Sequence, residues 1–256
     1  MVNMRFEGRT AIVTGGASGI GRGICLKLAE EGANIVVADV EREPALDEKP
    51  TDELVEEKGS NSLFVETDVS DEEEVKELVY TAASEFGEIN MLVNNAGIHG
   101  GGSVVDTSEE EWDKIQSVNL KGAFLCSKHV IHHMLEEEIQ GDIVNIGSIA
   151  GLVGFAQNSP YCASKGGIVE LTRSMAVDYG PKGININAVD PGVIKTAMTK
   201  PMLEDEETRQ NFEAQTLAPR LGQPEDIANA VAYLLSEESD FVMGSNLVVD
   251  GGWTAK

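Results

Sequence analysis

The chain has 256 residues, of which 41% are hydrophobic and 25% charged, a composition that supports a sizeable buried core and argues against a disordered chain. Its 44 acidic and 19 basic residues give a formal net charge of −25. Because nucleic acid and anionic membranes would repel such a chain, neither is expected as a partner.

The three cysteines, Cys25, Cys126 and Cys162, lie far apart and form no CxxC pair. This spacing argues against a disulfide framework and a zinc cluster, and it favours a reducing compartment. The first ten residues lack the apolar run of a signal peptide, and no stretch approaches the roughly 18 apolar residues that cross a bilayer. We therefore expect a cytoplasmic protein.

In the first half of the chain, short apolar runs alternate with helical patterns. Strands are predicted at residues 10–14, 34–39, 63–66 and 89–93, and helices at 19–31 and 71–86. Asp71 and the three glutamates after it place negative charge in the first turn of the second helix, where it complements the helix dipole. Residues 44–61 are polar and indicate a helix within a looser excursion, which Pro50 interrupts.

The same alternation continues in the second half. Ser108 and Glu111 form a capping-box pattern at the start of a helix predicted over residues 108–133. Strands at 142–146, 184–189 and 246–249 alternate with helices at 160–178 and 224–236. This order predicts an α/β fold, a single-domain Rossmann-like doubly wound parallel sheet of about seven strands with helices on both faces. The domain is expected to span residues 1–256, with the polar stretch 195–223 as a substrate lid.

A glycine-rich segment follows the first strand. Gly15, Gly19 and Gly21 permit a tight turn and a close approach of the backbone to a pyrophosphate, which would sit at the N-terminus of the next helix. Their spacing differs from G-x-G-x-x-G, so an ordinary tight turn between a strand and a helix is the alternative interpretation.

Asp39 ends the second strand, 18 residues after Gly21. A carboxylate at this distance is placed to bond the ribose hydroxyls of NAD, and it would repel the 2′-phosphate of NADP. NAD is therefore the expected cofactor and NADP the less favoured one. Arg22 and Arg42, which could serve that phosphate, are interpreted as surface charges.

Tyr161 and Lys165 lie one turn apart on a predicted helix and share a face. An ammonium beside a phenol favours the phenolate, and this lowers a pKa that is otherwise about 10. Ser148, which follows the fifth strand, can donate a hydrogen bond to an alcohol or carbonyl oxygen. Tyr-x-x-x-Lys alone is equally consistent with a pair on a helix surface.

Over almost its whole length the chain resembles the classical short-chain dehydrogenase/reductases. The resembling segments are TGGASGIG at 14–21, DV at 68–69, NNAG at 94–97, PGVIKT at 191–196, RLG at 220–222 and VDGG at 249–252. The family's catalytic tetrad is matched in order and spacing by Asn119, Ser148, Tyr161 and Lys165.

The resemblance implies hydride transfer between NAD and a secondary alcohol or ketone, with no metal. Tyr161 would take the alcohol proton while Ser148 steadies the substrate oxygen. Lys165 would lower the pKa of Tyr161 and bond the nicotinamide ribose, and Asn119 would hold a water for proton exchange. The cofactor-binding residues it implies are Gly15, Ser18, Gly19, Ile20, Gly21, Asp39, Asp68, Val69, Asn95, Ala96, Gly97, Tyr161, Lys165, Pro191, Gly192, Val193, Ile194 and Thr196. A homotetramer is also implied, with a dimer as the alternative.

Asp190 departs from the family pattern, in which a small or neutral residue usually precedes the Pro-Gly pair. It is either a harmless local acid or a negative charge near the nicotinamide that favours the oxidised ring. His129, His132 and His133 have a helical spacing that can hold a metal, but a peripheral helix surface explains them more simply, and no metal site is expected.

The substrate remains open among a sugar or polyol, a 3-oxoacyl thioester and a cyclic alcohol. We expect His99, residues 151–155 and the lid to shape the pocket. Within the lid, Met198, Met202 and Phe212 either form an apolar wall over the substrate or anchor the lid to the core. The alternative functions are a sugar-nucleotide epimerase or dehydratase, which usually needs an added substrate domain, and a non-catalytic NAD-binding regulator.

The charge of −25 also bears on assembly, because like-charged subunits repel one another. At 1 M salt the Debye length falls to about 3 Å, which screens this repulsion. We therefore expect the melting temperature to rise by about 3 °C or more between dilute buffer and molar KCl. A melting temperature that does not rise would favour an ordinary acidic cytoplasmic enzyme over adaptation to a salty cell interior.

Overall fold

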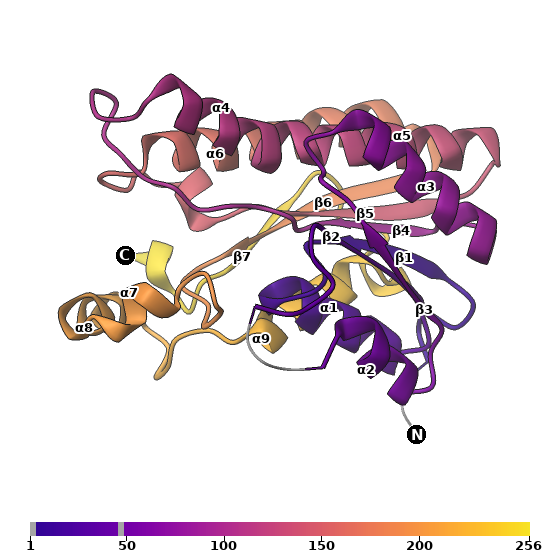
Figure 1. Cartoon of the computed structure of the whole chain (residues 1–256), viewed down its shortest axis with the longest axis horizontal. Helices are drawn as coiled ribbons and strands as arrows, with labels where there is room; N and C mark the ends of the chain where they lie inside the picture. The colour runs from indigo at the N-terminus through magenta and orange to yellow at the C-terminus, as the bar shows by residue number, and fades with distance from the viewer. Residues whose placement is uncertain (1–3, 46–48) are drawn as a thin grey trace.

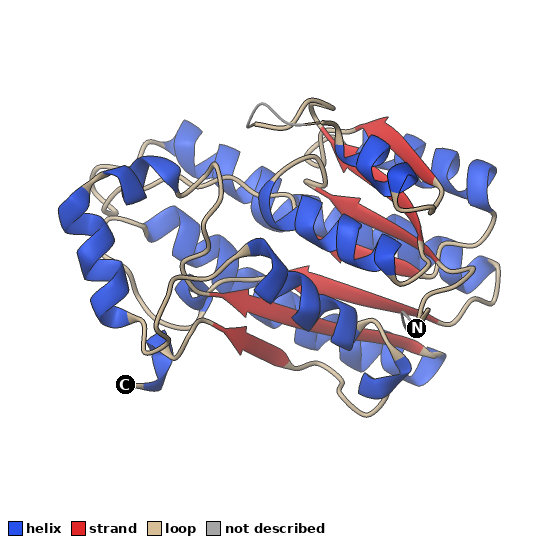
Figure 2. Cartoon of the chain, turned by 90° about the horizontal axis from the view of Figure 1, so that it is seen from below, coloured by secondary structure: helices blue, strands red, loops and turns tan. Residues whose placement is uncertain are grey.

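The computed structural model describes residues 4–45 and 49–256, and the strands of this part form one parallel sheet (Figures 1 and 2). The sheet has seven strands in the order β3-β2-β1-β4-β5-β6-β7. They are β1 Thr10–Thr14, β2 Asn34–Asp39, β3 Ser62–Glu66, β4 Met91–Asn94, β5 Gly141–Ile146, β6 Ile184–Pro191 and β7 Asn246–Val249. The predicted doubly wound parallel sheet is confirmed.

Helices cover both faces of the sheet, α1, α2 and α9 on one and α3, α4, α5 and α6 on the other (Figure 1). Alternate strand residues serve the two layers: Val13 packs with the α1 side and Ile12 with the α3–α5–α6 side. The α-helices are α1 Gly19–Glu30, α2 Thr51–Glu57, α3 Glu72–Phe86, α4 Glu109–Gln116, α5 Gly122–Glu136, α6 Ser159–Tyr179, α7 Lys200–Glu204, α8 Glu206–Gln215 and α9 Pro224–Leu234.

The strand order reverses at β1, because β1 pairs with β2 on one side and with β4 on the other. At such a switch point the loops that leave neighbouring strands turn to opposite faces of the sheet and open a crevice beyond their carboxyl ends. The short helices α7 and α8 lie at this end of the sheet (Figure 2).

One predicted helix is divided in the structure. Residues 108–133 were expected to form a single helix, but a π-helical turn, Ser117–Lys121, separates α4 from α5, and α5 continues to Glu136. Ser108 caps α4 by accepting from the Glu111 N–H, which is the half of the predicted capping box that the described residues show. Asp71, predicted in the first turn of its helix, is the N-cap of α3 and accepts from the Glu73 and Glu74 N–H groups. Single-turn π segments shift the register of a helix, and the periodicity of apolar residues does not reveal that shift.

The helix content of two polar stretches differs from what the sequence predicts. Residues 44–61 contain less helix than predicted, and residues 195–223 contain more. Within residues 44–61 only α2 is helical, and it begins directly after Pro50; residues 46–48 lie outside the described part. The predicted lid stretch, 195–223, contains α7 and α8, the second capped by Asp205. No helix in the described residues is long and apolar enough to cross a membrane.

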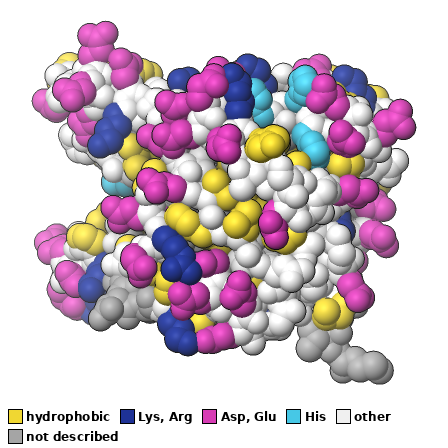
Figure 3. Space-filling view, turned by 45° about the vertical axis from the view of Figure 1, so that its right-hand side comes forward, with side chains coloured by type: hydrophobic (Ala, Val, Ile, Leu, Met, Phe, Trp, Pro, Cys, Tyr) yellow, Lys and Arg dark blue, Asp and Glu magenta, His cyan; other side chains and the backbone are white. Residues whose placement is uncertain are grey.

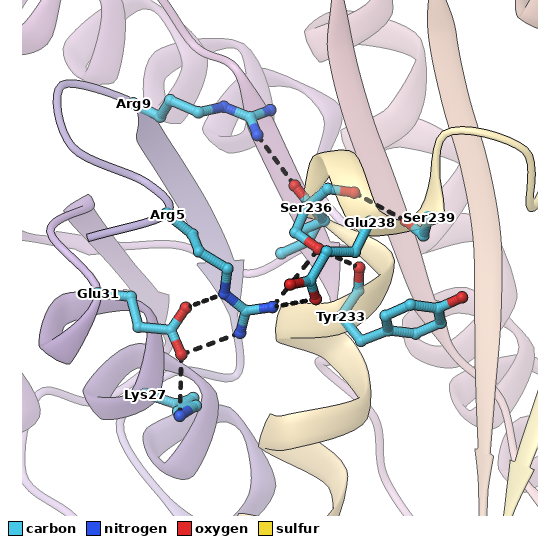
Figure 4. Close-up of polar contacts among 9 residues, drawn as sticks. Arg5, Arg9, Lys27, Glu31, Tyr233, Ser236, Glu238 and Ser239 are labelled. Carbon is cyan, nitrogen blue, oxygen red and sulfur yellow. Dashed lines mark hydrogen bonds and ion pairs between the residues drawn. The ribbon is translucent and has the colours of Figure 1, made fainter. Parts of the chain in front are cut away.

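Acidic side chains spread over the visible surface with lysines and arginines among them (Figure 3). One cluster of charges is instead partly buried, where the chain enters β1 (Figure 4). Arg5 donates to both carboxylate oxygens of Glu31, at 2.5 and 2.9 Å, and Lys27 reaches the same carboxylate at 2.9 Å. Arg5 also donates to Glu238 at 3.0 Å. The cluster therefore joins the N-terminal segment to the end of α1 and to the turn after α9.

Burial alone would raise the pKa of Glu31, but the hydrogen bonds from Arg5 and Lys27 outweigh it and lower the pKa. Replacement by glutamine keeps the size and leaves two cations without a counter-charge. We expect Glu31→Gln to lower the free energy of unfolding by about 2 kcal/mol, as for other hydrogen bonds to charged groups. Urea denaturation followed by circular dichroism measures this. The matched control is Glu213→Gln, which removes an exposed i,i+4 partner of Arg209 and should cost under about 0.5 kcal/mol. Equal effects of the two variants would contradict the prediction.

Candidate active site

A cavity of about 400 Å³ lies beyond the carboxyl ends of β1, β2, β4, β5 and β6. Most of the predicted site residues line it: Gly15, Ser18, Gly19, Ile20, Asp39, Asp68, Val69, Asn95, Ala96, Gly97, Ser148, Tyr161, Lys165, Pro191, Gly192, Ile194 and Thr196. Gly21, Asn119 and Val193 do not line it. Segments that are distant in the sequence therefore meet at the switch point.

The turn after β1 is packed so closely against the chain that only glycine fits at two of its positions. Gly15 has φ +63°, and a Cβ there would lie 2.8 Å from the Asn95 amide nitrogen. A Cβ on Gly21 would lie 2.1 Å from the Gly15 carbonyl oxygen, so Gly21 acts by packing beneath the turn. The Ser18 hydroxyl accepts from the Ala45 N–H and does not cap α1. The first N–H groups of α1 thus have no side-chain cap, which fits an anionic phosphate.

The Asn95 side chain fixes this turn against β4. Its amide donates to the carbonyl oxygens of Thr14 and Gly15 at 2.9 and 3.0 Å. The Thr14 hydroxyl in turn accepts from the backbone N–H groups of Asn95 and Ala96. The glycine turn and the start of the NNAG segment are therefore one rigid unit.

Asp39 is held at the end of β2 by backbone donors. Its carboxylate accepts from the Ala17 and Val40 N–H groups at 3.0 and 2.9 Å. Burial raises the pKa of Asp39, and these N–H groups oppose the rise. Arg42 is engaged by Asp52 and Glu53, and Arg22 donates to the Lys49 carbonyl oxygen at 2.7 Å.

Ser148, Tyr161 and Lys165 meet where β5 and α6 come together. Ser148 begins a short 3₁₀ turn, and its hydroxyl accepts from the Ala150 N–H at 3.0 Å. The Lys165 ammonium donates to the Ile146 carbonyl oxygen at 2.8 Å and lies 5.8 Å from the centre of the Tyr161 ring. Lys165 is only 5% exposed, so its charge is buried next to the phenol.

The pKa directions in this cluster follow from burial. Burial raises the pKa of Tyr161, and a hydrogen bond with Ser148 opposes the rise. The net direction is the opposite of what the sequence predicts from Lys165 alone. Burial lowers the pKa of Lys165 to about 8, and the charge of Asp190 opposes that fall. Lys165 therefore keeps its positive charge at neutral pH.

Asn119 lies in the π-helical turn and is 2% exposed. Its amide accepts from the Ile98 N–H at 2.8 Å and donates to the Ile98 carbonyl oxygen at 3.0 Å. It also donates to the Ser164 hydroxyl at 3.1 Å. These contacts tie the segment after β4 to α6, close behind the cavity wall.

The cavity wall has further members that the sequence analysis did not name as cofactor-binding or catalytic residues, the last three of them in the predicted lid. They are Val40, Thr67, Ile98, Val118, Ile146, Gly147, Ala197, Met198 and Thr199. Several directly follow a predicted strand, so their place beyond its carboxyl end was the available signal. Val193 is instead fixed through its backbone, because its carbonyl oxygen accepts from the Gly222 N–H at 3.0 Å.

The apolar residues of the lid divide between the two roles that the sequence left open. Met198 lines the main cavity. Phe212 contacts Trp253, with ring centres 5.9 Å apart, and so anchors α8 to the C-terminal segment. Phe155, Phe212 and Trp253 also line a second hollow of about 350 Å³.

His129 and His132 each contact a different glutamate. His129 contacts Glu72 at 3.1 Å and His132 contacts Glu136 at 3.0 Å. Within residues 4–45 and 49–256, no group of three or more His, Cys, Asp and Glu side chains is arranged to hold a metal. His99 lies at the entrance to the site, with its ring centre 5.1 Å from that of Tyr161 and its Nε2 2.9 Å from Asn158 Oδ1.

Comparison with known proteins identifies the family to which the sequence and the fold point. A family model described as Enoyl-(Acyl carrier protein) reductase matches residues 15–254. The chain is 37% identical over 252 residues to meso-2,3-butanediol dehydrogenase of Serratia marcescens, covering 98% of this chain and 97% of that protein. It is 41% identical over 251 residues to cis-4-hydroxycyclohexanecarboxylate dehydrogenase of Sinomonas cyclohexanicum, covering 98% of each.

A solved structure of an Agrobacterium tumefaciens protein with bound NADP has a TM-score of 0.90 and 35% identity, and the match covers 100% of both chains. The family model and the relatives span nearly the whole sequence, and the structural match has the same fold. The chain therefore belongs to the classical short-chain dehydrogenase/reductase family.

Proposed function

We propose that the chain interconverts a secondary alcohol and a ketone, with NAD as the hydride partner and Tyr161 as the group that exchanges the substrate proton. The chain is an oxidoreductase of its family, an alcohol dehydrogenase or ketone reductase. One observation carries the assignment of residues: Ser148, Tyr161 and Lys165 line the same cavity as the glycine turn and Asp39.

A nicotinamide cofactor, when bound, supplies the hydride acceptor or donor. In this proposal the glycine turn and the N-terminus of α1 hold its pyrophosphate, and Asp39 bonds its adenine ribose. Asp68 and Val69 line the adenine side. The segment from Asn95 to Gly97 and the segment from Pro191 to Thr196 flank the nicotinamide side.

The substrate oxygen is proposed to lie between the hydroxyls of Ser148 and Tyr161. In oxidation the Tyr161 phenolate takes the alcohol proton, and in reduction the phenol returns it. A hydrogen bond with Ser148 opposes the rise in pKa that burial imposes on Tyr161. The Lys165 ammonium, 5.8 Å from the centre of the Tyr161 ring, is proposed to favour the phenolate as well. Asn119 fixes the backbone at Ile98, and its role in holding a water for proton exchange stays a prediction.

The substrate side of the cavity is proposed to lie under the lid, residues 195–223. Met198 contributes an apolar wall there, and His99 stands at the entrance. The relatives named above act on a diol and on a hydroxylated ring. A compact secondary alcohol with a second polar group is therefore the proposed substrate class.

We also propose a homotetrameric assembly and a cytoplasmic location. Trp112, Phe124 and Val177 are exposed apolar residues on α4, α5 and α6, which supports burial of this face against another subunit in a homotetramer. Trp253 is already buried within its own chain against Phe155 and Phe212. A cytoplasmic location is proposed from the acidic composition and the three dispersed cysteines.

The role of Tyr161 is tested by removing its hydroxyl. We expect Tyr161→Phe to lower kcat by about 10²- to 10⁴-fold, the usual contribution of acid–base catalysis, while the Kd for NADH changes little. NADH absorbance with a panel of secondary alcohols, diols and cyclic alcohols measures turnover, and fluorescence titration measures the Kd. In the wild type, oxidation should speed up with rising pH as the phenolate forms, until Lys165 loses its charge above about pH 8, and reduction should slow. The control is Tyr179→Phe on the same helix; substantial turnover by Tyr161→Phe would refute the role.

The choice of cofactor is tested at Asp39. We expect the wild type to have the higher kcat/KM with NAD, and Asp39→Asn to lower the NAD-to-NADP ratio of kcat/KM by about tenfold or more, since the variant removes the charge that repels a 2′-phosphate. Asp68→Asn, in the same cavity, should leave that ratio unchanged. A wild type that prefers NADP, as the Agrobacterium tumefaciens structure with bound NADP illustrates for a relative, would overturn the assignment.

A further inference from the structure

A buried carboxyl group lies directly behind the reacting groups and has no part in the mechanism above. Asp190, the next-to-last residue of β6, is 0% exposed. Its Oδ1 accepts from the Ser148 N–H at 3.1 Å. Its Oδ2 is buried and has no hydrogen-bond partner among the described residues. The side chain presses on Gly147, where a Cβ would lie 1.9 Å from Oδ1.

The hydrogen bond to Ser148 does not by itself explain a carboxyl group at this position. A neutral amide or hydroxyl oxygen would accept from the same N–H, without the cost of taking an ionised group out of water. A buried charge with one unpartnered oxygen needs an opposite charge nearby to be stable. The Lys165 ammonium lies beside the same stretch of chain without forming an ion pair: it donates to the Ile146 carbonyl oxygen, one residue before Gly147, which the Asp190 carboxyl contacts.

Lys165 is buried as well, and its only described hydrogen bond is to the neutral carbonyl of Ile146. Among the described residues no carboxylate lies within ion-pair distance of its ammonium. Asp190 is the acid whose charge acts on it and raises its pKa against the effect of burial. The positive charges of Lys165 and Arg173 in turn act to lower the pKa of Asp190, against the effect of burial.

We propose that Asp190 is a positioning residue that keeps Lys165 charged through the upper part of the working pH range. The inference rests on the proposed role of Tyr161 as the proton-exchanging group. The Lys165 ammonium and the Tyr161 phenol together carry two ionisable protons, and once one has been lost the remaining proton resides either on the amine or on the phenol oxygen. A negative charge that acts on Lys165 favours the proton on the amine, which leaves Tyr161 as the phenolate that can accept a substrate proton.

The other ionisable groups around this cluster are few in the described part of the chain. Lys165 and Arg173 face Asp190 from α6, and β5 and β7 bring no ionisable side chain to it. Cys162, His99 and Lys165 face Tyr161. None of these supplies a second negative charge to Lys165, so the replacement of Asp190 isolates one interaction.

The negative charge of Asp190 can act on a charged Lys165 only between the pKa of Asp190 and the pKa of Lys165. Burial raises the pKa of Asp190 to about 6, so the carboxyl is ionised above that pH. Burial lowers the pKa of Lys165 to about 8, so the ammonium is lost above that pH. Removing the Asp190 charge lowers the pKa of Lys165 further, and the loss of its positive charge then begins at a lower pH.

The test is the pH profile of alcohol oxidation by Asp190→Asn, which removes the charge and retains an oxygen for the Ser148 N–H. We expect the alkaline limb of kcat to move down by about one pH unit. At pH 9 the variant should then be about tenfold slower than the wild type, and at pH 7 less than about twofold slower. Asp190→Ser is a second neutral variant, for which the same displacement is expected.

The matched control is Asp142→Asn, because Asp142 is a half-buried carboxylate at the far end of β5, paired with Arg9. It should lose stability and keep the wild-type pH profile. An alkaline limb of Asp190→Asn that coincides with that of the wild type would overturn the proposal. A changed ratio of NAD⁺ to NADH affinity with an unmoved limb would also overturn it, since the charge would then act on the nicotinamide directly.

A measurement on the wild type keeps the proposal falsifiable if the variants do not fold. Carbon-13 labelling of the aspartate carboxyls reports the ionisation of Asp190 by NMR. An Asp190 carboxyl that stays protonated between pH 7 and pH 9 would refute the proposal.

Failure of the proposed function is distinguished from failure of this inference. Turnover that survives Tyr161→Phe overturns both proposals. An inactive Tyr161→Phe with an unmoved alkaline limb in Asp190→Asn overturns this one alone.

Discussion

The buried ammonium of Lys165 is the constraint on which the site depends. A cation this far from water is costly, and the fold offsets the cost with the Ile146 carbonyl at the carboxyl end of β5 and with the charge of Asp190 at the end of β6. Both partners require β5 and β6 to end at the same level as the start of α6. The register of the parallel sheet, in which Ile146 lies opposite Val189, provides that alignment.

The cofactor side of the cavity depends on local dipoles rather than on net charge. A chain with a net charge of −25 would repel a dinucleotide from a distance. The N–H groups at the start of α1 act at contact distance, where they outweigh the distant field. Asn95 holds those groups in place by bonding to the carbonyls of Thr14 and Gly15. An acidic surface and an anion-binding cavity are therefore compatible in one fold.

The fold and most of the site could be predicted from the sequence because both depend on local patterns. Strand ends are readable from apolar runs, and a parallel sheet brings those ends to one edge, so Asp39 and Ser148 were expected at the same edge, where both line the cavity. The π-helical turn around Asn119 could not be predicted, since inserting one residue in a helical turn leaves no periodic trace. The lid was expected as irregular chain, but the cap at Asp205 and the polar helix formers after it give α8.

The pKa of Tyr161 could not be predicted from the sequence spacing of Tyr161 and Lys165 alone. Residues four apart on a helix predict that Lys165 acts on the phenol, and the 5.8 Å separation from its ring agrees. Burial raises the pKa of the same phenol, an effect that the helix spacing does not reveal. Because the two effects oppose each other, the phenolate is accessible only while Lys165 remains charged. In the proposed mechanism a second buried charge holds the proton on Lys165, and Asp190, whose Oδ1 accepts from the Ser148 N–H, is the carboxyl group proposed to supply that charge.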